Sequence, residues 1–170
     1  MAKSEIPRIE TEYLMVINPN FKLEEVGTTP YGKRRIVHSA TGDFKGQGKL
    51  KGLKGTIETA FGWTLIRAHD HVWEINVRMV LRPSGDTSKE SLIYASWMGL
   101  RHAYANRAAE RMMETNKPES VKSKPIYFRI SRYFETSPKG KYAWLNKICT
   151  IGTGTLGDAT ARTLHIFRVL

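Results

Sequence analysis

The chain has 170 residues, of which 41% are hydrophobic and 25% are charged, and its net charge at pH 7 is +11. This composition is typical of a globular domain and excludes a fibrous or disordered chain, and the length predicts one domain over residues 1–170. No apolar run is long enough for a membrane span, and the single cysteine, Cys149, excludes an intramolecular disulfide. We therefore expect a cytoplasmic protein, and the positive charge favours anionic partners.

Residues 1–8 show no strand pattern and are expected to form a tail. After them, apolar and polar residues alternate in many short runs, which is the pattern of strands with one buried face. These predicted strands cover residues 9–17, 33–40, 56–61, 63–68, 71–81, 92–98, 126–134 and 160–170. Residues 103–116 are rich in alanine and other good helix formers, and they predict one surface helix.

The stretch 125–146 predicts a hairpin with two different faces. Ser137–Gly140 supplies the turn, and a second extended run is expected to begin near Tyr142. With this hairpin, the chain predicts an all-β, mainly antiparallel fold, a closed or nearly closed barrel of about 8–10 strands.

Arginine, tyrosine and tryptophan recur on the less apolar face of several predicted strands. A barrel of about eight strands is wide enough to hold one small molecule, and buried polar groups need a partner. We therefore predict a ligand pocket inside the barrel, lined by Trp63, Asn76, Arg78, Tyr94, Tyr127, Arg129, Tyr142, Trp144 and Asn146. The opposite orientation stays open: Ile126, Phe128, Ile130 and Leu145 would then fill the barrel, with the tyrosines outside.

Motifs for phosphate loops, dinucleotide binding and nucleophile elbows are absent from the sequence. His69-Asp70-His71 has the spacing of two ligands on one strand face, but it is read as a polar turn. No cofactor and no metal are expected.

Several short motifs resemble a known family. They are Arg34–Val37, Gly42–Gly46, Gly99–His102, Tyr127–Arg129, Phe134–Thr136 and Tyr142–Asn146, in this order along the chain. Together they resemble the uncharacterised small β-barrel family catalogued as domain-of-unknown-function family 3237. The resemblance implies an antiparallel barrel with a central cavity and brings no settled reaction.

The chain also departs from the pattern of that family. Gly62 and Asn76 stand where relatives usually carry aspartates. If the aspartates are an acid–base pair in relatives, Glu74 and Glu135 are the candidate replacements here.

Three functions are compatible with these features. The first is a cofactor-independent isomerase, cyclase or lyase that acts on an aromatic or polyketide-like compound of secondary metabolism, with Arg129 and Tyr127 as hydrogen-bond donors and Glu74 or Glu135 as base. The second is a non-catalytic barrel that binds a small aromatic or anionic ligand. Specific nucleic-acid binding ranks last, because the basic residues are spread along the chain. A homo-oligomer is left open.

Overall fold

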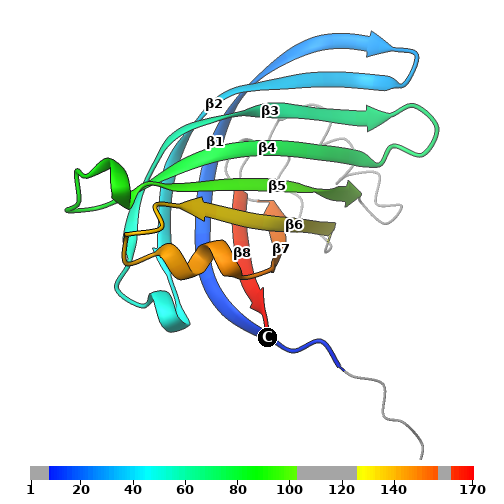
Figure 1. Cartoon of the computed structure of the whole chain (residues 1–170). Coiled ribbons are helices and arrows are strands. Elements are labelled where there is room, and N and C mark those ends of the chain that lie inside the picture. The colour runs from blue at the N-terminus through cyan, green and yellow to red at the C-terminus, as the bar shows by residue number, and fades with distance from the viewer. Residues whose placement is uncertain (1–7, 103–125, 157–161) are drawn as a thin grey trace, which may run out of the picture.

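The computed structural model describes residues 8–102, 126–156 and 162–170. Its eight strands are β1 (Thr11–Thr29), β2 (Gly32–Gly46), β3 (Lys54–Arg67), β4 (Trp73–Pro83), β5 (Ile93–His102), β6 (Tyr127–Thr136), β7 (Thr150–Leu156) and β8 (Arg162–Val169). Each strand pairs antiparallel with the next, and β8 pairs with β1, so the sheet is a closed barrel (Figure 1). The predicted all-β barrel is confirmed, whereas the helix expected at 103–116 lies outside the described residues.

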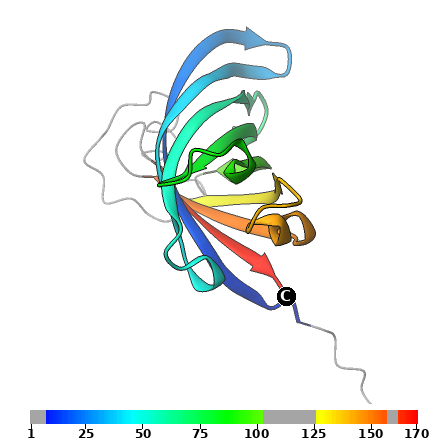
Figure 2. The same cartoon turned by 60° about the vertical axis from the view of Figure 1, so that its left-hand side comes forward.

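Short 3-10 helices lie in three connections on the same end of the barrel. They are η1 (Gly48–Leu50), η2 (Lys89–Ser91) and η3 (Ala143–Lys147). Leu50, Tyr142 and Leu145 join the hydrophobic core from these connections, so this end, which we call the closed end, is covered (Figure 2). No helix within the described ranges is long and apolar enough to cross a membrane.

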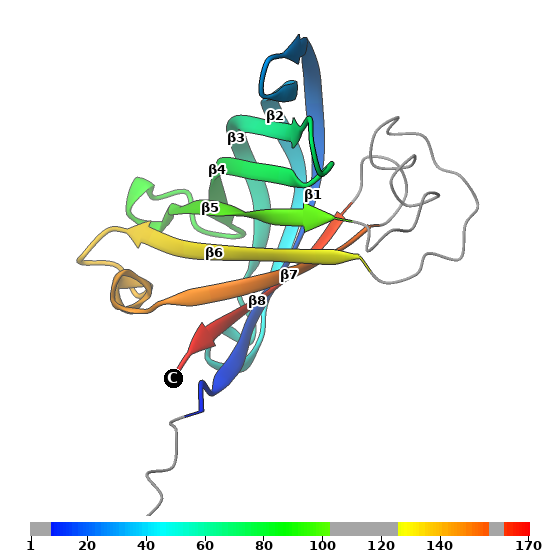
Figure 3. The ribbon, with the colours of Figure 1, turned by 90° about the vertical axis from the view of Figure 1, so that its right-hand side faces the viewer.

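Strand β1 is longer than the sequence predicts. Asn18-Pro19-Asn20 was expected to end it, but it continues to Thr29, paired with β2. Its pairing with β8 covers only Thr11–Ile17, so β1 runs on past β8 (Figure 3). Proline is tolerated at an unpaired strand edge, and Pro19 lies just beyond the last pair with β8.

The predicted hairpin at 125–146 is half correct. Its first strand is β6, but the residues after the turn form the helix η3 instead of a second strand. The return strand, β7, begins only at Thr150. The alternation of Tyr142, Trp144 and Asn146 therefore does not mark the face of a strand.

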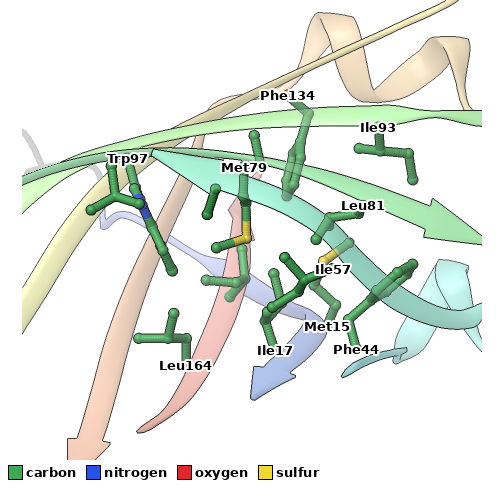
Figure 4. Close-up of a cluster of buried hydrophobic side chains, with 14 of the residues drawn as sticks. Met15, Ile17, Phe44, Ile57, Met79, Leu81, Ile93, Trp97, Phe134 and Leu164 are labelled. Atoms are coloured by element: carbon green, nitrogen blue, oxygen red, sulfur yellow. The ribbon is translucent and has the colours of Figure 1, made fainter. Parts of the chain in front are cut away.

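The core runs through the barrel from the closed end. Apolar side chains from β1–β6 and β8 meet in it, among them Met15, Phe44, Met79, Leu81 and Phe134 (Figure 4). Toward the opposite end, the inward residues of β4, β5 and β6 include Trp73, Trp97 and Phe128. Trp97 and Phe128 belong to the core and also line a cavity, which is therefore the candidate ligand site inside the barrel.

Substitution of Gly154 tests the packing of β6 against β7. A Cβ atom at this position would lie 2.2 Å from Cδ1 of Phe128, on the ring that fills the barrel. We expect Gly154→Ala to lower the free energy of unfolding by about 1–3 kcal/mol, measured by urea denaturation. Exposed Thr155→Ala on the same strand is the control, and adding Phe128→Leu should recover part of the loss. Equal stability of the Gly154 and Thr155 variants would contradict this packing.

Substitution of Asn146 tests how η3 is fixed to β6. The Asn146 side-chain oxygen accepts a hydrogen bond from the Thr136 backbone N–H (2.8 Å), and its amide donates to the Thr136 carbonyl (2.9 Å). Asn146→Ala removes both, and we expect a loss of about 1–2 kcal/mol in the free energy of unfolding. Exposed Lys147→Ala should change it little. An unchanged unfolding midpoint for Asn146→Ala would show that the two bonds contribute nothing.

Candidate functional site

The barrel contains a narrow cavity away from the closed end. Its walls are mostly aromatic and aliphatic: Phe21, Leu23, Val37, Thr64, Trp73, Ile75, Val77, Trp97, Arg101, Phe128, Ile130 and Leu164. The cavity measures about 30 Å³, which is enough for a water molecule. A ligand of more than a few atoms therefore needs the half-buried wall residues Phe21 and Leu23 to move.

Two arginines lie over one tryptophan at this cavity. The guanidinium carbon of Arg101 is 3.9 Å from the centre of the Trp73 ring, and that of Arg35 is 5.2 Å from it. Arg35 also lies 3.8 Å from a carboxylate oxygen of Glu25, a residue whose side chain is about half exposed. Both arginines are buried, so the Trp73 ring is covered by positive charge within the barrel.

A third arginine, Arg132, is buried below the cavity. Its guanidinium carbon lies 4.6 Å from the Trp97 ring and 5.0 Å from the Phe134 ring, and none of its three side-chain nitrogens has a hydrogen-bond partner within the described part of the chain. Burial lowers the pKa of Arg132 to about 9, so the group is still charged at pH 7. Burying an unpaired ion costs several kcal/mol, and each ring contact returns only about 0.5–2 kcal/mol.

Hydrogen-bond donors dominate the polar groups of the interior. A guanidinium and an indole N–H can only donate, and among the described residues neither Nε1 of Trp97 nor the hydroxyl of Thr64 has a partner. No aspartate, glutamate or histidine belongs to the buried residues of the described chain. The described interior therefore offers hydroxyl acceptors but no anionic acceptor.

Most residues predicted to line the pocket lie on the outer face of the barrel. Neighbouring positions on the same strands fill the interior, which is the orientation that the sequence pattern also allowed. The outer set comprises Trp63, Asn76, Arg78, Tyr94, Tyr127 and Arg129. They contact other outer residues: Arg34 lies over Trp63 (4.8 Å), Arg78 donates to Asn76 (2.9 Å), and Tyr94 packs near Tyr133 (6.4 Å).

Tyr127 and Arg129 border a groove on that outer face. The groove, between β5, β6 and β7, measures about 570 Å³ and also involves Leu100, Ile151 and Thr153. Arg129 donates to its neighbouring carbonyl at Phe128 (3.0 Å) and to the Thr153 hydroxyl (2.8 Å). The Arg129 guanidinium is exposed to water and already hydrogen-bonded, so it gains less free energy from a bound anion than a buried guanidinium does.

None of the four positions considered for acid–base chemistry places a carboxylate in the cavity. They are Glu74, Glu135, Gly62 and Asn76. Glu74 lies 3.8 Å from Arg67 on the outer side of β4, and Glu135 is exposed. Gly62 has a φ of +154°, and a Cβ there would lie 2.2 Å from the Asn76 carbonyl oxygen. No group of three or more potential metal ligands occurs among the residues that the structure describes.

The remaining predicted pocket residues lie at the closed end. Tyr142 is buried in the core, Trp144 packs against it, and Asn146 bonds to Thr136 as described above. Tyr142 and Trp144 also border a recess of about 370 Å³ whose rim carries four lysines: Lys49, Lys51, Lys54 and Lys141. These three residues thus do not meet Tyr127 and Arg129 in one pocket.

The three interior arginines were missed as site residues. One signal was present in the sequence, because Arg132 interrupts the apolar side of the run from Ile126 to Phe134. Such an interruption indicates a charge that points into the barrel. Arg35 and Arg101 give no comparable signal, since Arg35 ends the basic run Lys33-Arg34-Arg35 and Arg101 lies beyond the predicted strand 92–98.

Known structures share this fold. A protein of unknown function from Rhodopseudomonas palustris has a TM-score of 0.78 at 23% identity, with 97% of this chain and 100% of that chain covered. A β-barrel-like protein from Acinetobacter baumannii has a TM-score of 0.74 at 28% identity, covering 99% and 100%. A protein described as an enzyme, from Penicillium herquei, has a TM-score of 0.59 at 15% identity, covering 99% of both chains.

A comparison with curated proteins gave no match. The sequence pattern described as "Protein of unknown function (DUF3237)" matches residues 7–169, nearly the whole chain. The chain therefore belongs to the DUF3237 family.

Proposed function

We propose that the barrel binds a small aromatic anion in the interior cavity. The observation that carries this proposal is buried positive charge beside aromatic rings, with Arg101 over Trp73 and Arg132 over Trp97, in an interior where the described buried residues include no carboxylate. A ligand with an acidic oxygen complements this charge, and its flat body fits between Trp73, Trp97 and Phe128.

The same geometry supports chemistry without a cofactor. Negative charge that develops on a ligand oxygen during an isomerisation, a ring closure or an elimination is stabilised by a fixed cation in a dry site. Arg101 is the residue that we assign this role, and the aromatic walls orient the reacting atoms. The protein is thus proposed to be an isomerase, cyclase or lyase acting on an aromatic or polyketide-like compound, in the cytoplasm.

A passive binding barrel is the second candidate. One observation favours it: the Thr64 hydroxyl is the cavity's sole described side chain able to accept a proton in a hydrogen bond, and a hydroxyl is a weak base. The Penicillium herquei protein described as an enzyme shares the fold at 15% identity, so its description does not decide between the two. Catalysis and binding must be separated by experiment.

The binding experiment compares benzoate with the uncharged benzyl alcohol, followed by the fluorescence of the cavity tryptophans. We expect benzoate to bind more tightly, and Arg101→Met to weaken it at least about tenfold, because a hydrogen bond to a charged group contributes about 1.5–3 kcal/mol. Arg129→Met on the outer face is the matched control and should leave the affinity unchanged. Loss of binding in the Arg129 variant, with none in the Arg101 variant, would move the site to the outer groove.

The turnover experiment asks which candidate is correct. Aromatic ketones and phenols that bind are incubated with the protein and with Arg101→Met, and the compounds are analysed by mass spectrometry and NMR. Conversion that the Arg101 variant slows supports an enzyme. Recovery of every bound compound unchanged supports the passive barrel.

Nucleic acid is proposed to bind weakly and without sequence preference. The lysine-rimmed recess at the closed end attracts any polyanion, and such attraction falls steeply with salt. We expect Lys49→Glu with Lys51→Glu to abolish retention on heparin or DNA at low salt while leaving benzoate binding intact. Sequence-dependent binding at physiological salt would contradict this assignment.

A further inference from the structure

We propose that the ligand carries two acidic groups, one at each end of a flat body, and that Arg132 receives the inner group while Arg101 receives the outer one. This inference rests on the proposed function, since it concerns the same cavity. It adds the class of ligand, a para-type aromatic diacid or a molecule with the same spacing of charges.

The two guanidiniums lie at different levels of the barrel. Arg101 pairs with Trp73 on one side and Phe128 on the other, and its guanidinium carbon lies 3.9 Å and 5.9 Å from those two rings. Arg132 pairs with Trp97, and its guanidinium carbon lies 4.6 Å from that ring and 5.0 Å from the ring of Phe134, the next inward residue toward the closed end. The levels of the two residues are therefore a lower bound on the separation of the two charges.

Strand geometry gives the distance between these levels. On β6, Arg132 lies four residues after Phe128, which pairs with Arg101. Every second residue of this stretch faces inward, so both side chains point into the barrel. Four residues of a strand span about 13 Å. A carboxylate oxygen sits about 2.8 Å from each guanidinium nitrogen, which leaves roughly 7 Å between the two acidic ends, the scale of one benzene ring with para substituents.

The inner position is built to receive an acceptor. Arg132 is buried, its three nitrogens lack partners, and its neighbour Thr150 uses its hydroxyl to bond the Arg132 carbonyl oxygen (2.7 Å). Trp97 contacts Arg132, lines the cavity, and has an Nε1 without a partner among the described residues that can also donate. An oxygen that reaches the floor beside Trp97 satisfies both groups.

Simple structural roles account for Arg132 less well. A guanidinium kept for stability is normally paired, because an unpaired buried ion destabilises the folded state. Methionine would fill the same volume without a charge. We therefore infer that the ligand supplies the counter-ion of Arg132. Arg132 then destabilises the ligand-free protein but not the complex.

The experiment compares three probes by calorimetry: benzoate, benzene-1,4-dicarboxylate and benzene-1,2-dicarboxylate. The last two have the same charge and differ in the separation of their acids. We expect the 1,4-diacid to bind at least tenfold more tightly than benzoate, and the 1,2-diacid to resemble benzoate. Arg132→Met should abolish the advantage of the 1,4-diacid over the 1,2-diacid, Arg132→Lys should keep part of it, and Arg129→Met should keep all of it.

Thermal melting gives a second readout, and its comparison of the two diacids needs only the unaltered protein. The 1,4-diacid should raise the melting temperature of the unaltered protein more than the 1,2-diacid does, and ligand-free Arg132→Met should melt higher than the unaltered protein. Equal affinity for the two diacids, or an unchanged 1,4-diacid advantage in Arg132→Met, would overturn the inference while the proposed function stands. Failure of benzoate and both diacids to bind would overturn the proposed function itself.

Discussion

Closure of the sheet by the pairing of β1 with β8 is the constraint on which the rest of the structure depends. The pairs from Thr11 to Ile17 join the first strand to the last, and a closed sheet gives every alternating strand an inner and an outer face. Closure therefore commits Phe128, Ile130, Arg132 and Phe134 to the inside of β6. The charge of Arg132 is carried inward as a consequence of register, because a shift by one residue would expose the apolar set.

The interior that results is unbalanced in both charge and hydrogen bonding. Glu25 offsets Arg35 near the rim, but none of the described buried residues is acidic, so they include no counter-ion for Arg132. In a medium of low dielectric constant such a charge acts on its surroundings more strongly than it would in water. Under the proposed function, positive charge in the narrow aromatic cavity selects anions first and shape second.

Much of the fold could be predicted from the sequence, and the site could not. Period-two alternation identified β4, β6 and the barrel class correctly, because this signal depends on one buried face. It could not say which face, since Tyr127 and Arg129 on one side and Ile126, Phe128 and Ile130 on the other are each plausible linings. The failure at Tyr142–Asn146 has another cause: five residues are too few to separate the period of a strand from the three-residue period of a 3-10 helix, in which Tyr142 and Leu145 are the buried residues.

The narrowness of the cavity follows from the same side chains that give it selectivity. Trp73 and Trp97 fill most of the space at their levels, and they also hold the guanidiniums of Arg101 and Arg132 by ring contacts. A ligand ring that enters between them replaces protein–protein stacking with protein–ligand stacking, so the apolar contribution to affinity is small. The surplus comes from the buried donors that gain an acceptor, which places the discrimination between ligands in their acidic groups and in the distance that separates them.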